Sequence, residues 1–269
     1  MATHNYVRLL GALRKPPKII SLANSRAAMF NIIVINKSRF EKDTYYYNVP
    51  TIFTEDEMMI DDIVNYKEHD IVEVEGVITT KNVIKASLCE YCGQKNVKEK
   101  ATIFVVTPLY LCLRESGIAT KEESLRLLQP HAEISNKCFA IGTLLRDPEL
   151  IAIGKKKKNT VRYPLAIHRK YYIRDNPDTH SDYPWVNTIG EQAEDDMRYL
   201  HAGSVVYIDG YIQTRNAIQT SVCSHCGESY HWKDSAVEII GYSVEYLQNY
   251  YTPDEVIEHD PFDVIQVEG

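Results

Sequence analysis

Two stretches of this chain alternate apolar and polar positions in the same way. Residues 70–93 (DIVEVEGVITTKNVIKASLCEYCG) and residues 204–227 (SVVYIDGYIQTRNAIQTSVCSHCG) align without a gap at a separation of 134 residues. In each copy, β-branched residues at alternate positions run through a glycine and continue beyond it, which is typical of a strand. Each copy then passes a Cys-x-x-Cys-Gly sequence and returns through a second apolar run, at 103–106 or 237–240. The pattern predicts a long β-hairpin with two cysteines at its tip, present twice.

The segments before each hairpin follow one order. In the first half, three strand-like segments precede a short helix predicted over 54–66, where Thr54 and Glu57 have the spacing of a capping box. Strands are predicted at 5–13, 27–35 and 45–52, and again at 136–145, 161–168 and 185–189, where the helix follows at 191–200. Three strands, a helix and two strands is the order of the OB-fold, a five-stranded Greek-key barrel. We therefore expect a mainly β protein of two tandem OB-fold barrels, each with a short helix and a long hairpin tipped by Cys-x-x-Cys.

This order divides the 269-residue chain into four parts, which suits the length of a two-domain protein. The parts are OB-fold 1 (1–113), a helical linker (114–133), OB-fold 2 (134–249) and an acidic C-terminal tail (250–269). The linker helix is predicted from Glu115 to Gln129, with Pro130 ending it. The last 18 residues hold six acidic and no basic side chains, so we expect disorder in the tail.

The distribution of charge changes the meaning of the formal net charge of -7. The tail accounts for most of it, and the rest of the chain is close to neutral. Between Lys137 and Arg174 the sequence holds ten lysines or arginines against Asp147 and Glu149. A local surplus of this kind predicts a surface that follows phosphate groups.

Several classes of protein are not indicated by the sequence. No apolar run reaches the ~18 residues of a membrane span, and residues 1–15 lack a signal-peptide pattern. We therefore expect a cytoplasmic protein without a membrane partner. No Walker lysine loop, H-E-x-x-H sequence or spaced nucleophile and base is present, so we expect no enzymatic activity.

Four of the six cysteines form the two Cys-x-x-Cys pairs. Structural zinc takes four thiolate or imidazole ligands in a tetrahedron, and one Cys-x-x-Cys supplies half of such a site. The second pair has His225 and His231 nearby, whereas the first has no histidine, which favours one zinc shared by both pairs. Disulfides, free thiols or two separate zinc sites remain open. The expected ligands are Cys89, Cys92, Cys223 and Cys226, while Cys112 and Cys138 are expected in the core.

The second half resembles the bacterial single-stranded DNA-binding protein (SSB) family. The residues that carry the resemblance are Asn136, Gly142, 145–149 (LRDPE), 164–166 (PLA), 185–187 (WVN), 190–194 (GEQAE), 203–210 (GSVVYIDG) and 214–215 (TR). The first half matches weakly, and its membership depends on the internal repeat. The matching residues are Asn5, Leu9, Gly11, Leu13 and the strand around Gly76. The resemblance implies a barrel whose basic groove follows the single strand while aromatic side chains stack on its bases, an interaction that tolerates any base.

The resemblance also implies positions for stacking residues. Trp185 and Tyr171 stand where the family carries stacking aromatics, whereas Ile189 and Ala217 stand where two others are expected. Substitute aromatics could be Tyr172, Tyr211 and Trp232. The expected phosphate or base contacts of the second half are Arg146, Lys155, Lys156, Lys157, Lys158, Arg162, Arg169, Lys170, Arg174 and Arg215. Those of the first half are Arg39, Phe40, Tyr45, Tyr47 and Lys81, the last at the position of Arg215.

We therefore expect a non-enzymatic protein that coats and protects single-stranded DNA during replication, recombination or transfer of DNA. Relatives with two OB-folds in one chain are homodimers, so the resemblance implies a homodimer here. The acidic tail is a candidate site for recruiting replication or recombination proteins. Two alternatives stay open: an RNA- or tRNA-binding OB module, and a zinc-stabilised scaffold whose groove binds protein.

Overall fold

The computed structural model describes the chain except for residues 1–4, 23–24, 39–40, 154–158, 170–180 and 258–269. The elements of the first half are β1 (Asn5–Leu13), β2 (Lys18–Ser21), β3 (Arg26–Lys37), β4 (Tyr45–Asn48), β5 (Thr51–Thr54), α1 (Glu57–Ile63), β6 (Ile71–Leu88) and β7 (Lys95–Glu115). The linker contains α2 (Lys121–Leu128) and the 3-10 helix η1 (Gln129–His131). The second half contains β8 (Asn136–Leu144), β9 (Glu149–Ile153), β10 (Asn159–His168), β11 (Ser181–Asp182), β12 (Trp185–Ile189), α3 (Glu191–Tyr199), β13 (Val205–Val222), β14 (Ser229–Gln248) and α4 (Pro253–Ile257). The mainly β character predicted from the sequence is confirmed, and none of the described helices is long and apolar enough to cross a membrane.

Strand pairing closes a ring of five strands in each half. In the first half β1 pairs with β3 and β6, β3 pairs with β5, β6 pairs with β7, and β5 runs parallel to β7. In the second half β8, β10, β12, β14 and β13 make the same five contacts, including the parallel one between β12 and β14. The alternate residues of these strands that point inward are mostly buried valines, leucines and isoleucines, and they form the main core.

An approximate two-fold axis relates the two halves. It passes through the antiparallel pairing of β1 with β8, where Val7 lies opposite its own equivalent, Cys138. Contacts away from the axis occur in equivalent pairs. The backbone N–H of Thr80 donates to Asp182 Oδ1 (2.7 Å), and that of Thr214 donates to Asn48 Oδ1 (2.9 Å). The duplication seen in the sequence therefore produces a pseudo-dimer within one chain.

Each long hairpin bends at its glycine. Strand register shifts between Glu75 and Gly76 in β6, and between Asp209 and Gly210 in β13. A Cβ atom at Gly76 would lie 2.3 Å from a backbone oxygen of β7, and one at Gly210 would lie 2.1 Å from a backbone oxygen of β14. Only glycine fits such a bulge, which bends the strand as it leaves the ring.

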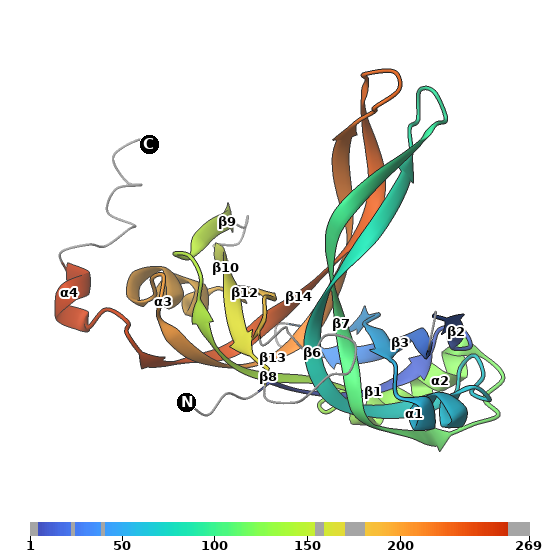
Figure 1. The fold of residues 1–269 in the computed structure, drawn as a ribbon. Helices are drawn as coiled ribbons and strands as arrows, with labels where there is room; N and C mark the ends of the chain where they lie inside the picture. The colour runs from blue at the N-terminus through green and yellow to red at the C-terminus, as the bar shows by residue number, and fades with distance from the viewer. Residues whose placement is uncertain (1–4, 23–24, 39–40, 154–158, 170–180, 258–269) are drawn as a thin grey trace.

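Beyond the bend the two hairpins run side by side and form an arm, defined here as residues 83–101 and 217–234 (Figure 1). Lys85 Nζ donates to both carboxylate oxygens of Asp234 (2.6 and 2.9 Å), and Ser87 Oγ lies 2.6 Å from Tyr230 Oη. These contacts join the inner faces of the two hairpins and bring both tips to the same end of the arm.

Three local predictions were wrong. Asp56, not Thr54, caps α1 by accepting from the N–H groups of residues 58 and 59, because Thr54 is the last residue of β5 and its hydroxyl accepts from Asp56. The predicted strand 45–52 is divided into β4 and β5, which pair with different parts of β3. The predicted apolar runs 103–106 and 237–240 do lie in the returning strands, β7 and β14, where the polar residues beside them also pair along the hairpins. Cys112 is partly exposed rather than buried in the core.

The linker and the tail also differ from the predictions. The linker helix begins at Lys121 rather than Glu115, because Glu115 pairs with Ile71 at the end of β7. The first residues of the tail are ordered: α4 follows Tyr251, whose N–H donates to the backbone of Tyr199 at 2.8 Å. The rest of the predicted disordered tail, residues 258–269, lies outside the described residues.

Candidate nucleic-acid interface and metal centre

The four paired cysteines meet at the tip of the arm. Their Sγ atoms all lie within 4.8 Å of one another, with Cys89 3.8 Å from Cys226 and Cys92 3.6 Å from Cys223. Each pair is shaped in the same way: the N–H of the glycine after the second cysteine donates to the carbonyl of the first, at 2.9 Å or 3.0 Å. These glycines, Gly93 and Gly227, have φ of 69° and 77°, a left-handed conformation that glycine adopts without strain. Both of these sulfur contacts join one hairpin to the other.

This arrangement has the dimensions of a tetrahedral thiolate site. With Zn–S bonds of about 2.3 Å, the edge of a regular tetrahedron is about 3.8 Å, close to both measured separations. The N–H groups of Cys226 and His225 point at the Cys223 sulfur and outweigh its burial, lowering the pKa of Cys223 to about 6. Among the described residues the four-sulfur group includes neither His225 nor His231. The arrangement matches one shared site rather than two separate ones.

A buried carboxylate organises the basic and aromatic side chains of the second half. Glu238, on β14, is 2% exposed and accepts from Asn187 Nδ2 at 2.7 Å and from Arg215 Nη2 at 2.9 Å. Arg162 Nη2 lies 3.1 Å from the same carboxylate. Burial alone would raise the pKa of Glu238, but the hydrogen bonds and charges of these partners outweigh it and lower the pKa. The carboxylate therefore stays ionised and fixes both guanidinium groups.

Trp185 lies against this charged group. The Arg162 guanidinium lies 3.9 Å from the centre of the half-buried indole ring, and that of Arg146 lies 5.7 Å from it. The structure thus brings together four residues that the sequence predicted separately: Arg146, Arg162, Trp185 and Arg215. We call them, with Glu238, the Trp185 cluster. Glu238 was missed, although its place as an acid within the apolar run 237–240 could have indicated a paired charge.

The first half holds a smaller set at the equivalent place. Lys81 Nζ lies 3.5 Å from the centre of the Phe53 ring and 3.8 Å from Glu55 Oε1. Burial lowers the pKa of Lys81 to about 8 although Glu55 opposes that shift, and the nearby charge of Arg169 lowers it further. Phe53 was not predicted, because its strand gives no signal that separates an outward from an inward aromatic.

Other predicted residues lie elsewhere. Arg169 is buried in a bidentate ion pair with Asp182 (2.9 and 2.6 Å), so its role as a phosphate contact was wrong and it holds β10 to β11. Tyr211 packs against Tyr242, with ring centres 4.8 Å apart. Trp232 lies in the arm beside the cysteines, and its Nε1 donates to Ser221 at 3.0 Å.

On β4 of the first half, Tyr47 is exposed, whereas Tyr45 packs partly buried against the linker side of the core. Ten of the predicted residues lie outside the described residues, in 39–40, 154–158 and 170–180. They are Arg39, Phe40, Lys155, Lys156, Lys157, Lys158, Lys170, Tyr171, Tyr172 and Arg174.

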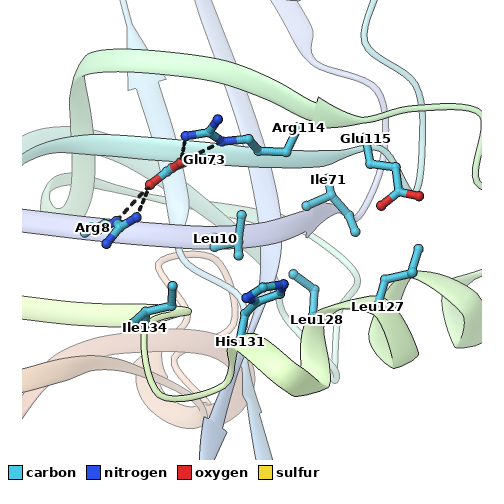
Figure 2. A pocket seen from close by; sticks show the side chains of 10 residues that line it. All are labelled: Arg8, Leu10, Ile71, Glu73, Arg114, Glu115, Leu127, Leu128, His131 and Ile134. Carbon is cyan, nitrogen blue, oxygen red and sulfur yellow. Dashed lines mark hydrogen bonds and ion pairs between the residues drawn. The ribbon is translucent and has the colours of Figure 1, made fainter.

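A hollow lies between the linker helix and the outer face of the sheet (Figure 2). Its floor is apolar, with Leu10 and Leu128 among the lining residues, and Glu73 lies at one end. Arg8 Nε and Arg114 Nε donate to the two oxygens of this buried carboxylate at 2.8 and 2.7 Å. Burial would raise the pKa of Glu73, but the two arginines lower it. The ion pairs join β1, β6 and β7 below the linker.

Comparisons with known proteins agree on one family. Residues 135–224 match the model of the "Single-strand binding protein family". The chain is 29% identical over 127 residues to "Single-stranded DNA-binding protein 2" of Clostridium acetobutylicum, covering 44% of this chain and 93% of that protein. It is 32% identical over 81 residues to "Single-stranded DNA-binding protein 1" of a Staphylococcus aureus strain, covering 30% of this chain and 51% of that protein. The chain therefore spans about half the length of the Staphylococcus relatives it matches.

Among solved structures, the chain is similar to the wild-type single-stranded DNA binding protein from Thermus aquaticus. The superposition has a TM-score of 0.60, with 15% sequence identity, and covers 94% of this chain and 97% of that one. At this identity the likeness shows a shared fold. It extends over both halves, whereas the family model matches the second half alone.

Proposed function

Through residues 135–224 the chain belongs to the single-strand binding protein family, and from this premise we propose that it binds single-stranded DNA without enzymatic activity. Coating of this kind protects and presents the strand during replication, recombination or transfer of DNA. The observation that carries the proposal is the Trp185 cluster, which sets the guanidinium groups of Arg146 and Arg162 beside one indole ring and holds Arg215 on the same carboxylate as Arg162.

The cluster suits a flexible strand of any sequence. A base can stack on the open part of the Trp185 ring, which contributes ~1–3 kcal/mol and requires no base-specific hydrogen bond. The three arginines and one carboxylate leave a net positive charge for the phosphate groups. Because Glu238 already holds Arg162 and Arg215 in place, less side-chain freedom is lost when the strand binds.

We also propose that the two rings of strands are tandem OB-folds, at residues 1–113 and 134–249. The linker is residues 114–133 and the acidic tail residues 250–269. Support comes from the identical strand pairing in the two halves and from the two-fold relation between β1 and β8.

The four cysteines at the arm tip are proposed to hold one structural zinc ion. The supporting observation is the pair of sulfur separations, both near the edge of a zinc–thiolate tetrahedron. The ion would join the two hairpins at the end farthest from the rings and would supply no catalytic chemistry.

A second copy of the chain is the proposed protein partner. Tyr6, Phe139 and Tyr207 form a column of stacked, half-exposed rings on the outer face of the sheet, with centres 6.4 and 6.5 Å apart. An aromatic surface of this kind is suited to burial in a homodimer. Recruitment of replication or recombination proteins through the tail is a further proposal, which depends on its acidic composition.

Fluorescence polarisation with labelled oligo-dT, oligo-rU and blunt duplex DNA at two salt concentrations tests the function. We expect preference for oligo-dT over the duplex and an affinity that falls steeply with salt. Trp185→Ala should weaken binding roughly 5- to 150-fold at every salt concentration, as the loss of ~1–3 kcal/mol of stacking requires.

Alanine at all four positions of 155–158 should instead flatten the dependence on salt, because fewer counterions are displaced. Equal binding to duplex and oligo-dT would refute the proposed function. Tighter binding to oligo-rU would favour an RNA-binding module.

A further inference from the structure

Part of the Trp185 cluster lies on one side of a groove whose other side belongs to the first half. The groove has a volume of about 600 Å³, within the range of about 300–1,000 Å³ typical of ligand sites. Arg162, Trp185 and Glu238 are among the residues of the second half in its lining, which also include a second carboxylate, Asp234. The first half contributes residues of β3, β5, β6 and β7, namely Met29, Thr51, Thr80, Lys85, Thr102, Ile103 and Phe104.

Strand pairing shows which residues of the two sides are equivalent. Asn31 pairs with Thr51 as Pro164 pairs with Trp185, so Thr51 holds the position of Trp185. By the same registers Met29 holds the position of Arg162. The groove therefore lies on the approximate two-fold axis, where equivalent surfaces of the two halves face each other.

The two sides differ in chemistry. Ile239 pairs with Val186 of β12 as Val106 pairs with Ile52 of β5, so Ile239 and Val106 are equivalent. Glu238, the residue before Ile239, is therefore equivalent to Val105. The first half thus has no tryptophan, arginine or carboxylate at these positions, and apart from one lysine its lining consists of methionine, threonines, isoleucine and phenylalanine. Its one cation in the lining, Lys85, is already bonded to Asp234.

Such a pair of surfaces fits one segment of a single strand. A base is flat and uncharged, so it can stack on the indole while its other side contacts methionine and threonine methyl groups. Within the groove the phosphate groups of that segment meet Arg162 on the second half, while Lys85 of the first half is paired with Asp234. The first half presents no carboxylate in the lining to repel them.

We propose that the two halves enclose a single strand in this groove, so that they form one shared subsite instead of two independent ones. Met29, Thr51 and Thr102 line it from the first half. The proposal rests on the function proposed above and adds a binding surface in the half that the family model does not match.

The test compares two substitutions that add the same charge to the first half. Met29→Glu places a carboxylate in the groove, and Met58→Glu places one on the outside of α1, where Met58 is 82% exposed. With the full chain and labelled oligo-dT, we expect Met29→Glu to weaken binding at least tenfold and Met58→Glu to change it less than twofold. Thermal unfolding of both variants checks that they fold.

A second measurement does not depend on the stability of Met29→Glu. Photocrosslinking from p-benzoylphenylalanine at position 102, an exposed position of β7 in the groove, should capture oligo-dT, whereas the same residue at position 58 should not. If Met29→Glu binds like Met58→Glu and position 102 gives no crosslink, while Trp185→Ala still weakens binding, the shared groove is wrong and the proposed function stands. If the unaltered protein does not prefer oligo-dT over duplex, both the shared groove and the proposed function are wrong.

Discussion

Loss of any one of the four arm cysteines should release the zinc ion that we propose for the arm. Purified protein should contain about one zinc per chain. Cys89→Ser and Cys223→Ser lie in different hairpins, yet both remove a corner of the same tetrahedron, so elemental analysis should show the same loss of metal in each.

The structure sets a scale for the effect on stability. The sulfurs of Cys92 and Cys223 meet across 131 residues of sequence. A permanent cross-link that closes a loop of that length would lower the conformational entropy of the unfolded chain by the equivalent of about 5 kcal/mol. The arm keeps its ion pair between Lys85 and Asp234 and the contact of Ser87 with Tyr230 when the metal leaves, so about 5 kcal/mol is an upper bound for global unfolding.

Urea unfolding of the two variants and of chelator-treated protein would measure this loss. The matched control is Cys112→Ser, because Cys112 lies on β7 outside the four-sulfur group and should leave both zinc content and stability nearly unchanged. Zinc that is retained in Cys89→Ser but lost in Cys223→Ser would refute a shared site. Metal-free protein with a disulfide within each Cys-x-x-Cys pair would refute the zinc proposal altogether.

Three further predictions concern charge and assembly. Because burial lowers the pKa of Lys81 to about 8, its charge is lost as pH rises, so affinity for oligo-dT should fall between pH 7 and pH 9; Lys81→Arg should remove that fall in polarisation titrations. Glu73 has a lowered pKa in the folded protein, so its contribution to stability is present above the ordinary glutamate pKa of about 4.3 and is lost as pH falls through the lowered value. Glu73→Gln should therefore cost about 1–3 kcal/mol in urea unfolding at pH 7 and progressively less in acid, and an equal cost at both would contradict the ionic role. Sedimentation at micromolar concentration should show a dimer that Phe139→Glu dissociates, whereas unaltered protein that sediments as a monomer would exclude this assembly.

The sequence by itself determined the repeat, the order of the elements and the paired cysteines. These features depend on local signals: alternation along a strand, a glycine in the middle of a strand, and the spacing of Cys-x-x-Cys. The asymmetry of nearby histidines was also enough to favour one shared metal site. Element ends were less certain, because Asp56 competes with Thr54 for the cap and because Glu115 is recruited by pairing with Ile71.

Tertiary structure decided which residues act together. Pairing of β1 with β8 across the approximate two-fold axis sets the two hairpins side by side, and this brings sulfurs 131 and 137 residues apart into contact. The same pairing turns the first half toward Trp185 and makes Met29 part of a groove that no local pattern indicates. Glu238 shows the reason. Its carboxylate is both buried and ionised because three different strands place Arg162, Asn187 and Arg215 within bonding distance of it. Such contacts depend on the register of the strands and not on the spacing of residues along the chain.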